Sequence, residues 1–166
     1  MSSDGMQGGA KPLISLILAT ANRAGWLEDL LDAIQSQQET RWELVAVDCG
    51  SEDSTLDALE SRAADDSRIK VLSIEETDKA IGRRQALHKA KGQYLAFPDP
   101  NSLWSPFCLT QLLKTFDQVP ENTGITYVPA EVLGDDGGVK RTLPEALRYG
   151  AMVWELFEKP QLPLSA

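Results

Sequence analysis

The chain of 166 residues contains one histidine, His88, and only two cysteines, Cys49 and Cys108. These are too few, and too far apart, to build a zinc site or a CxxC redox pair, so both classes of protein are excluded. We expect the two thiols to be reduced, as is usual in a cytoplasmic protein. The most apolar stretch, residues 13–21, is far shorter than the roughly 20 residues that a spanning helix needs, so no transmembrane segment is predicted.

Positive charge is also scarce. Lys and Arg number 16 against 25 Asp and Glu, which gives a formal net charge of −9. Because no basic run is long enough to outweigh this general repulsion, we expect neither nucleic acid nor an anionic membrane surface as a partner. Residues 1–11 are rich in Gly and Ser and are predicted to be a disordered tail, whereas residues 12–166 are predicted to form a single domain.

Short runs typical of strands alternate with helical patterns along the chain. Strands are expected at residues 13–18, 43–47, 69–73, 94–97 and 125–128, with helices between them and a hairpin at 132–139. A last helix is expected from Thr142 to Lys159. This alternation predicts an α/β fold, an open, twisted and mainly parallel sheet with helices on both faces. Asn22 is the expected cap of the first helix.

Ligands of such sheets bind beyond the carboxyl ends of the strands, and these segments are polar here. Residues 20–23 read Thr-Ala-Asn-Arg, residues 48–53 read Asp-Cys-Gly-Ser-Glu-Asp, and residues 99–104 read Asp-Pro-Asn-Ser-Leu-Trp. Any one of these segments is explained equally well as a turn followed by a helix cap. Three polar segments at one edge favour a ligand site.

The order of these segments resembles the N-terminal half of the family 2 glycosyltransferases of the GT-A fold. Residues 16–23 are similar to the family's opening strand and Pro-Thr-x-Asn-Arg loop, and residues 47–53 to its Val-Asp-Asp-Gly-Ser-x-Asp turn. Residues 82–87 resemble its Ala-Arg-Asn-x-Gly-Leu segment, and residues 91–97 its Lys/Arg-Gly-x-Tyr-Leu-Ala-Phe strand. Residues 99–104 are similar to its Asp-x-Asp-Asp-x-Trp metal loop, and residues 126–139 to the hairpin that follows. The resemblance therefore covers most of the chain.

The resemblance implies a domain that binds a nucleoside-diphosphate sugar and transfers the glycosyl group, with inversion, to an acceptor that the sequence does not identify. It implies Mg²⁺ or Mn²⁺ as the cofactor. The resemblance places two groups of site residues: Thr20, Asn22, Asp48 and Arg83 around the nucleotide, and Asp99 and Asn101 at the metal and diphosphate. It assigns no catalytic base.

Three departures from the family pattern leave a second interpretation open. Asn101 replaces the second carboxylate of the metal loop, Cys49 replaces the second Asp of the nucleotide turn, and Ala21 replaces an aromatic residue that would stack on the base. The alternative is therefore an inactive module of the same fold that acts as an interaction or scaffold subunit. Its protein partner, or a second copy, would bind through the apolar helix expected at residues 144–158. The apolar groups of this helix are explained equally well by burial in the core, and a membrane surface or a missing remainder of the fold could also cover them. A dinucleotide-binding domain is disfavoured, since no Gly-x-Gly-x-x-Gly follows the first strand.

For two of the polar residues the sequence allows a purely structural role as well. Asp53 precedes a helix and could be its cap, while Arg83 could belong to a solvated helix face. Cys49 is expected to be a small buried hydrophobe and His88 a surface residue.

Overall fold

The computed structural model describes residues 11–99, 102–121, 123–126, 130–133 and 139–143. The chain divides into two compact units, residues 1–110 and residues 111–166, which are described separately. Whether residues 12–166 form one domain stays a prediction.

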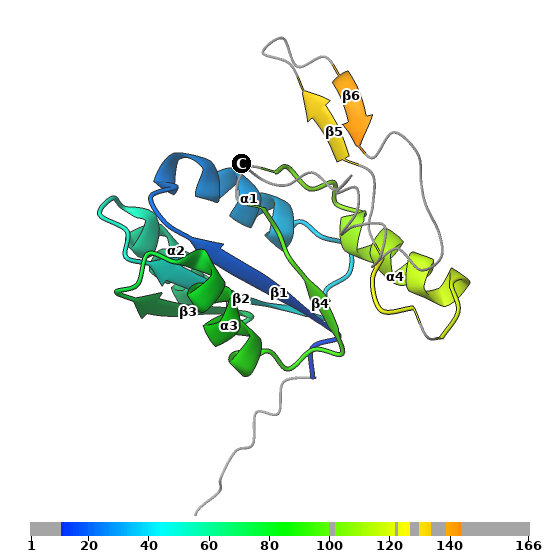
Figure 1. Ribbon diagram of the computed structural model, residues 1–166, viewed down its shortest axis with the longest axis horizontal. Coiled ribbons are helices and arrows are strands. Elements are labelled where there is room, and N and C mark those ends of the chain that lie inside the picture. Colours follow the sequence, from blue (N-terminus) through cyan, green and yellow to red (C-terminus); the bar gives the residue numbers. More distant parts are fainter. Residues whose placement is uncertain (1–10, 100–101, 122, 127–129, 134–138, 144–166) are drawn as a thin grey trace, which may run out of the picture. The chain divides into compact units, whose positions relative to one another are not determined.

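The first unit is built on a four-stranded sheet whose strand order is β3-β2-β1-β4 (Figure 1). The strands are β1 (Ile14–Thr20), β2 (Trp42–Cys49), β3 (Ile69–Ile74) and β4 (Tyr94–Ala96), and every neighbouring pair is parallel. All residues of β1 and β2 are buried, because both strands are central and covered on both faces. The predicted α/β fold with a parallel sheet is confirmed.

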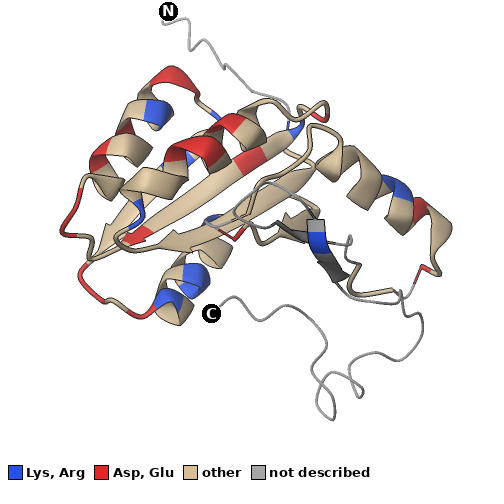
Figure 2. Cartoon of the chain, turned by 90° about the horizontal axis from the view of Figure 1, so that it is seen from above, with Lys and Arg blue, Asp and Glu red and all other residues tan. Residues whose placement is uncertain are grey.

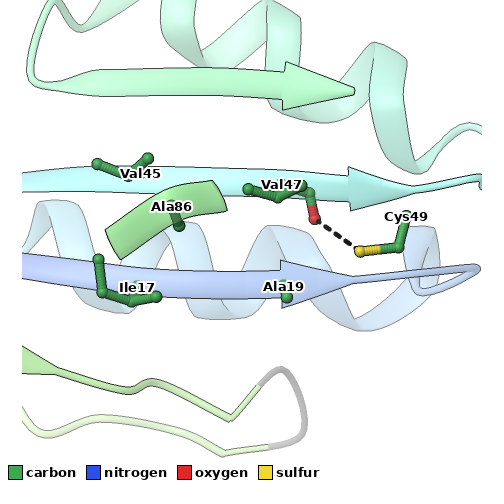
Figure 3. Packing of buried hydrophobic residues seen from close by; sticks show 6 residues of the cluster. All are labelled: Ile17, Ala19, Val45, Val47, Cys49 and Ala86. Atoms are coloured by element: carbon green, nitrogen blue, oxygen red, sulfur yellow. Dashed lines mark hydrogen bonds between the residues drawn. The ribbon is translucent and has the colours of Figure 1, made fainter. Parts of the chain in front are cut away.

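Three helices connect these strands: α1 (Ala24–Gln35), α2 (Thr55–Asp65) and α3 (Lys79–Lys89). The apolar stripe of α1 is fully buried and consists of Leu27, Leu30, Leu31 and Ile34. On the other side of the sheet, Ala86 of α3 packs with Ile17 and Val45 (Figure 3). Helices therefore lie on both faces of the sheet, as the sequence predicts.

Helix α3 approaches β2 very closely, and a glycine makes this possible. A Cβ atom on Gly82 would lie 2.5 Å from Cys49 Sγ and 3.2 Å from Ala19 Cβ. Real side chains do not pack at such distances, so only glycine lets the helix backbone rest on the strand ends. The helix begins at its cap Asp78, whose carboxylate accepts a hydrogen bond from the Ala80 N–H at 2.8 Å.

A buried carboxylate, Glu43, holds the connection between α3 and β4 at the amino end of the sheet. It accepts hydrogen bonds from Ser15 Oγ and from the Lys91 N–H, both at 2.6 Å, and it pairs with Lys70. Burial raises the pKa of Glu43, but these hydrogen bonds outweigh it and the pKa is lowered. Gly92 follows, and a Cβ there would lie 2.5 Å from the backbone nitrogen of Ser15.

The second unit contains most of α4 (Cys108–Gln118) and an antiparallel hairpin of β5 (Ala130–Leu133) and β6 (Val139–Leu143). The predicted hairpin is confirmed, with a register irregularity between Val132 and Leu133. Its turn, residues 134–138, lies outside the described residues.

Two expectations for this part of the chain are wrong. Thr142 does not begin a helix, because it pairs with Glu131 in β6; the predicted interface helix, residues 144–158, lies outside the described residues. Ile125 and Thr126 are not in a strand, and Ile125 is 70% exposed, so it lacks the packing that a central strand would give it.

Candidate functional site

The carboxyl ends of β1, β2 and β4 lie at one edge of the sheet, because the three strands are parallel and adjacent. Thr20 ends β1, Asp48 lies opposite it in β2, and Asp99 follows β4. The structure thus brings these three predicted site residues to the same edge. This is where ligands bind in open α/β sheets.

Asn22 ties the loop after β1 to the loop after β2. Its backbone N–H donates to Ser51 Oγ at 2.9 Å, and its side-chain Oδ1 accepts from the Glu52 N–H at 2.9 Å. Asn22 adopts φ +52°, in the left-handed region that Asn tolerates better than most residues. The expectation that Asn22 caps α1 is wrong: the cap position is Arg23, and the Asn22 side chain is turned to the other loop.

Asp53 connects the frame formed by the two hydrogen-bonded loops after β1 and β2 to helices α1 and α2. One carboxylate oxygen accepts from the Ala24 N–H at 3.2 Å, at the start of α1. The other accepts from the N–H of Thr55 at 3.0 Å and from its hydroxyl, at the start of α2. These hydrogen bonds, the one from the Thr55 hydroxyl above all, lower the pKa of Asp53. Asp53 therefore has a structural role at the start of α2, but it is not the cap that the sequence allowed, because the cap position is Ser54.

Asp48 is the buried carboxylate of the edge. Only 1% of the residue is exposed, and its two oxygens accept hydrogen bonds from the Ser51 N–H, at 3.1 Å, and from the Ser51 hydroxyl. Gly50, within this turn, has φ +65°, a conformation that glycine adopts without strain. Asp48 is thus held in one orientation by the turn that it closes.

Thr20 lies beside Asp48 in the β1–β2 register and is fully buried. Among the described residues its hydroxyl has no hydrogen-bond partner. A buried hydroxyl without a partner is costly, so one at a ligand-binding edge indicates a place for a polar ligand group or a bound water.

Cys49 does not line this edge. It is fully buried and belongs to one cluster with Val47 and Ala86 (Figure 3). A Cβ atom on Gly82 would lie 2.5 Å from its Sγ, so α3 covers it. Burial raises the pKa of its thiol, the Asp48 charge adds to this, and the charges of Lys79 and Arg83 oppose it. The expected small buried hydrophobe is confirmed, and an Asp at this position would have to displace α3.

Arg83 is exposed and lies near enough to Cys49 for its charge to act on the thiol. It makes no ion pair among the described residues, so its guanidinium is free to meet an anion. Arg23, in the loop after β1, is a further polar residue at this edge to which the sequence pattern assigns no separate role. Arg23 Nε is buried and has no hydrogen-bond partner in the part of the chain that the structure describes, and its Nη1 donates to Asn22 O at 3.2 Å.

The loop after β4 is held by Ser102. Its hydroxyl donates to Asp99 O at 2.8 Å and accepts from Trp104 Nε1 at 3.1 Å, so the tryptophan helps to fix the loop. Asn101 lies outside the described residues. No cluster of three acidic, His or Cys ligands occurs within the described ranges. One carboxylate with an amide oxygen is nevertheless a donor set that suits Mg²⁺ when substrate phosphates complete its coordination.

The open parallel sheet with its polar carboxyl edge belongs to the class of α/β domains that bind nucleotides beyond their strand ends. The comparison with known families agrees with this class. The family described as "Glycosyl transferase family 2" matches residues 15–159. The chain belongs to this family.

Two curated relatives illustrate the similarity. The putative teichuronic acid biosynthesis glycosyltransferase TuaG of Bacillus subtilis (strain 168) is 37% identical over 143 residues, which cover 84% of this chain and 56% of TuaG. The Escherichia coli enzyme WfgD is 28% identical over 143 residues, covering 85% of this chain and 55% of WfgD. Its name is UDP-Glc:alpha-D-GlcNAc-diphosphoundecaprenol beta-1,3-glucosyltransferase. The chain spans about half the length of these two relatives.

A solved structure shares the fold. The mannosyltransferase PcManGT of Pyrobaculum calidifontis, in complex with GDP-Man and Mn²⁺, superposes with a TM-score of 0.59 at 28% identity. The match covers 64% of this chain and 32% of PcManGT. Within the described part of this chain, no helix is both long and apolar enough to cross a membrane.

Proposed function

We propose that this chain is the donor-binding part of a glycosyltransferase that uses a nucleoside-diphosphate sugar. The observation that carries the proposal is the edge itself: the loops after β1 and β2 are hydrogen-bonded into one frame around the buried Asp48 and the unpartnered Thr20 hydroxyl. The sequence match to family 2 supports it, and so does the likeness to PcManGT, which was solved with GDP-Man and Mn²⁺.

In this proposal the nucleotide lies against the frame. Asp48 and the Thr20 hydroxyl offer an acceptor and a donor to the nucleoside, and the Asn22–Ser51 link keeps the two loops in register. Arg83 lies on the α3 side of the same edge, where its unpaired guanidinium attracts the diphosphate. Because the loops are fixed before the donor arrives, binding costs little loop ordering.

Asp99 and Asn101 would hold Mg²⁺ or Mn²⁺ in the same proposal. The cation would supply Lewis-acid stabilisation of the negative charge that grows on the leaving diphosphate. Ser102 and Trp104 keep the backbone of Asp99 in place for this role. Transfer with inversion to an acceptor hydroxyl and a cytoplasmic location are parts of the proposal, the latter resting on the two free thiols.

The test is ligand-induced thermal stabilisation with UDP-glucose and GDP-mannose, each with and without MnCl₂. A ligand present at about 100 times its Kd stabilises a protein by about 2.7 kcal/mol, which raises the melting temperature by several degrees. We expect a shift that needs Mn²⁺ and is lost in Asp99→Asn. The matched control is Asp57→Asn, the same change at an exposed position of α2, which should retain the shift. No shift with any donor and metal at about millimolar concentration would contradict donor binding.

A module of this fold without turnover is the second candidate function. It is favoured by the metal loop, where Asn101 stands in place of a carboxylate and the Ser102 hydroxyl is already engaged in two hydrogen bonds. The two candidates differ in donor hydrolysis. Release of free sugar from a bound donor by the wild-type chain, abolished in Asp99→Asn, would support the enzyme, whereas binding without release would support the module.

A further inference from the structure

The first unit carries opposite charges on its two helical faces (Figure 2). Helices α1 and α2 together contain six acidic residues and a single basic one, Arg62. Arg62 is engaged with Glu28 and, at 2.6 Å, with Asp32. Helix α3, on the other side of the sheet, contains no acidic residue. The charge of these three helices is therefore segregated between the two faces of the sheet, with Glu75, Glu76 and Asp78 exposed just before α3.

The basic side is dense in cations. Residues 79–91 hold five of the 16 Lys and Arg of the chain, together with its single histidine and without one Asp or Glu. Arg83, Arg84, His88, Lys89 and Lys91 are exposed. None of them forms an ion pair with another described residue. Arg83 belongs to the proposed donor site, so three positive charges remain for this surface, those of Arg84, Lys89 and Lys91. They repel one another and have no ion-pair partner among the described residues, so this surface gains from an anionic partner.

Apolar side chains are exposed next to these cations. Leu87, one helical turn from Arg84 and Lys91, is 40% exposed. Leu95 is 47% exposed and pairs with Ser15, so it lies on the side of the sheet that α3 covers. Phe97, directly after β4, is 56% exposed. Basic and apolar groups thus share one face of the unit, which we call the α3 face: Arg84, Leu87, His88, Lys89, Lys91, Leu95 and Phe97.

We propose that the α3 face docks on the surface of an anionic lipid membrane. Cations beside exposed leucine and phenylalanine match a layer of anionic headgroups over acyl chains, into which apolar side chains insert. A nucleic-acid backbone would use the cations but would leave these aliphatic side chains in water. This inference is independent of the proposed function, because it uses none of the residues assigned to the donor site.

The overall negative charge does not prevent such docking. Helices α1 and α2 lie on the far side of the sheet from α3. The distance between the two helix layers is on the order of 20 Å, because each layer packs about 10 Å from the sheet. This exceeds two Debye lengths at physiological ionic strength, about 8 Å each, so the membrane chiefly meets the basic face. The same asymmetry orients the unit, with α3 towards the lipid and α1 and α2 away from it. The sequence-based expectation of no anionic membrane partner rested on the summed charge and on the lack of a long basic run, whereas this proposal rests on cations that gather on one helix.

The test is flotation of the purified chain with vesicles of phosphatidylcholine containing about one-third phosphatidylglycerol, compared with pure phosphatidylcholine. We expect binding to the anionic vesicles only, and its loss as the salt concentration is raised. Each cation near such a surface contributes roughly fivefold to affinity, so Arg84→Gln with Lys89→Gln should weaken binding roughly 20-fold. The control is Lys114→Gln with Lys140→Gln, the same charge change at two exposed lysines of the second unit, which should leave binding unchanged.

Leu87→Gln tests the apolar part and should weaken binding without changing its salt dependence. Equal binding to both kinds of vesicle would overturn the proposal. So would an equal loss of vesicle binding in the Arg84→Gln/Lys89→Gln variant and in the control variant Lys114→Gln/Lys140→Gln. Binding to RNA but not to anionic vesicles would overturn it as well and assign the face to nucleic acid. Donor binding, measured by thermal shift, should be unaffected by these variants, so failure of the membrane proposal is distinct from failure of the proposed function.

Discussion

Asn22 and Ser51 join the two loops that form the candidate donor site: the backbone N–H of Asn22 donates to Ser51 Oγ at 2.9 Å. The same asparagine accepts a hydrogen bond from the Glu52 N–H through its side chain. Ser51 in turn donates to Asp48. The orientation of the buried carboxylate in β2 therefore depends on a residue in the loop after β1.

Replacing Asn22 should destabilise the chain through two separable effects. Asn22→Ala loses the side-chain hydrogen bond and places alanine, which tolerates the left-handed region less well than asparagine, at φ +52°. Together these two effects should lower the free energy of unfolding by about 1–3 kcal/mol. Asn22→Gly removes only the hydrogen bond and should lose less, and Asn22→Asp keeps the acceptor. Urea unfolding measures all three variants. Equal losses for alanine and glycine would contradict a role for the backbone conformation.

The contact between Gly82 and Cys49 predicts a specific pattern of additivity. Gly82→Ala should cost about 1–3 kcal/mol, since the new Cβ would lie 2.5 Å from Cys49 Sγ. Cys49→Ala removes that sulfur, so the double variant should be more stable than the sum of the single effects predicts, by about 0.5 kcal/mol or more. Relief should be partial, because Ala19 Cβ also lies 3.2 Å away.

Gly92→Ala is the control for this pair of substitutions. Its new Cβ would collide with the backbone of Ile14 and Ser15, at 2.7 and 2.5 Å, which Cys49→Ala does not relieve. The effects of Gly92→Ala and Cys49→Ala should therefore add. Additivity of Gly82→Ala with Cys49→Ala as well would show that the thiol does not limit the approach of α3.

Restoring the family's second Asp at Cys49 should not restore nucleotide binding. Cys49 is fully buried among Ile17, Val47 and Ala86, so Cys49→Asp introduces a carboxyl group with no partner into an apolar cluster. We expect a loss of about 3 kcal/mol or more in unfolding experiments at neutral pH. Asn101→Asp alone, by contrast, should strengthen the Mn²⁺-dependent thermal shift, since it adds a carboxylate to the metal loop. A stable Cys49→Asp variant that binds donor more tightly would show that position 49 faces the ligand.

Asp66 predicts a pH dependence of stability. Hydrogen bonds from Arg68 lower its pKa from 3.8 to about 2, and Arg68 itself lies over the Trp42 ring at 3.8 Å from the centroid. A lowered pKa stabilises the folded state at every pH above the unfolded value, and this contribution disappears as the pH falls from 3.8 to about 2. Asp66→Asn should therefore cost about 2 kcal/mol at neutral pH and almost nothing near the lower value.

Asp65→Asn is the control for the acid experiment. Asp65 is adjacent, carries the same charge and is exposed, and it forms no ion pair with another described residue. Its substitution should change stability by less than about 0.5 kcal/mol at either pH. Urea unfolding of both variants across this pH range gives the comparison, and parallel curves for the two variants would contradict the assigned role of Asp66.

Several features were predictable because they depend on local pattern. The continuous apolar run of β1 and the i, i+3, i+4 and i+7 spacing in α1 required only the periodicities of strand and helix. The hairpin of β5 and β6 followed from a Gly-rich turn between two short apolar runs. Two predictions near this turn were wrong, the strand at Ile125 and the helix starting at Thr142. At both places the local sequence does not determine which segment the backbone pairs with.

The candidate site was predictable only in part. The sequence placed Thr20, Asp48 and Asp99 at one edge, since parallel strands end together. It could not show that Asn22 turns to Glu52 rather than capping α1, because both roles use the same side-chain oxygen and the choice depends on a loop some 30 residues away. The burial of Cys49 was expected from its residue type, but the sequence could not show that the close approach of Gly82 covers it.

The sequence by itself determined the alternation of strands and helices, and through it the parallel sheet and the edge where polar residues gather, because hydrophobic periodicity is a property of neighbouring positions. Only the tertiary structure decided which of these polar groups form the hydrogen bonds that hold the loops, and that the Thr20 hydroxyl has no partner among the described residues. It also decided that the basic residues of α3 lie on the other side of the sheet from the acidic helices. Those outcomes depend on contacts between segments far apart in the chain, whose distances no local pattern contains.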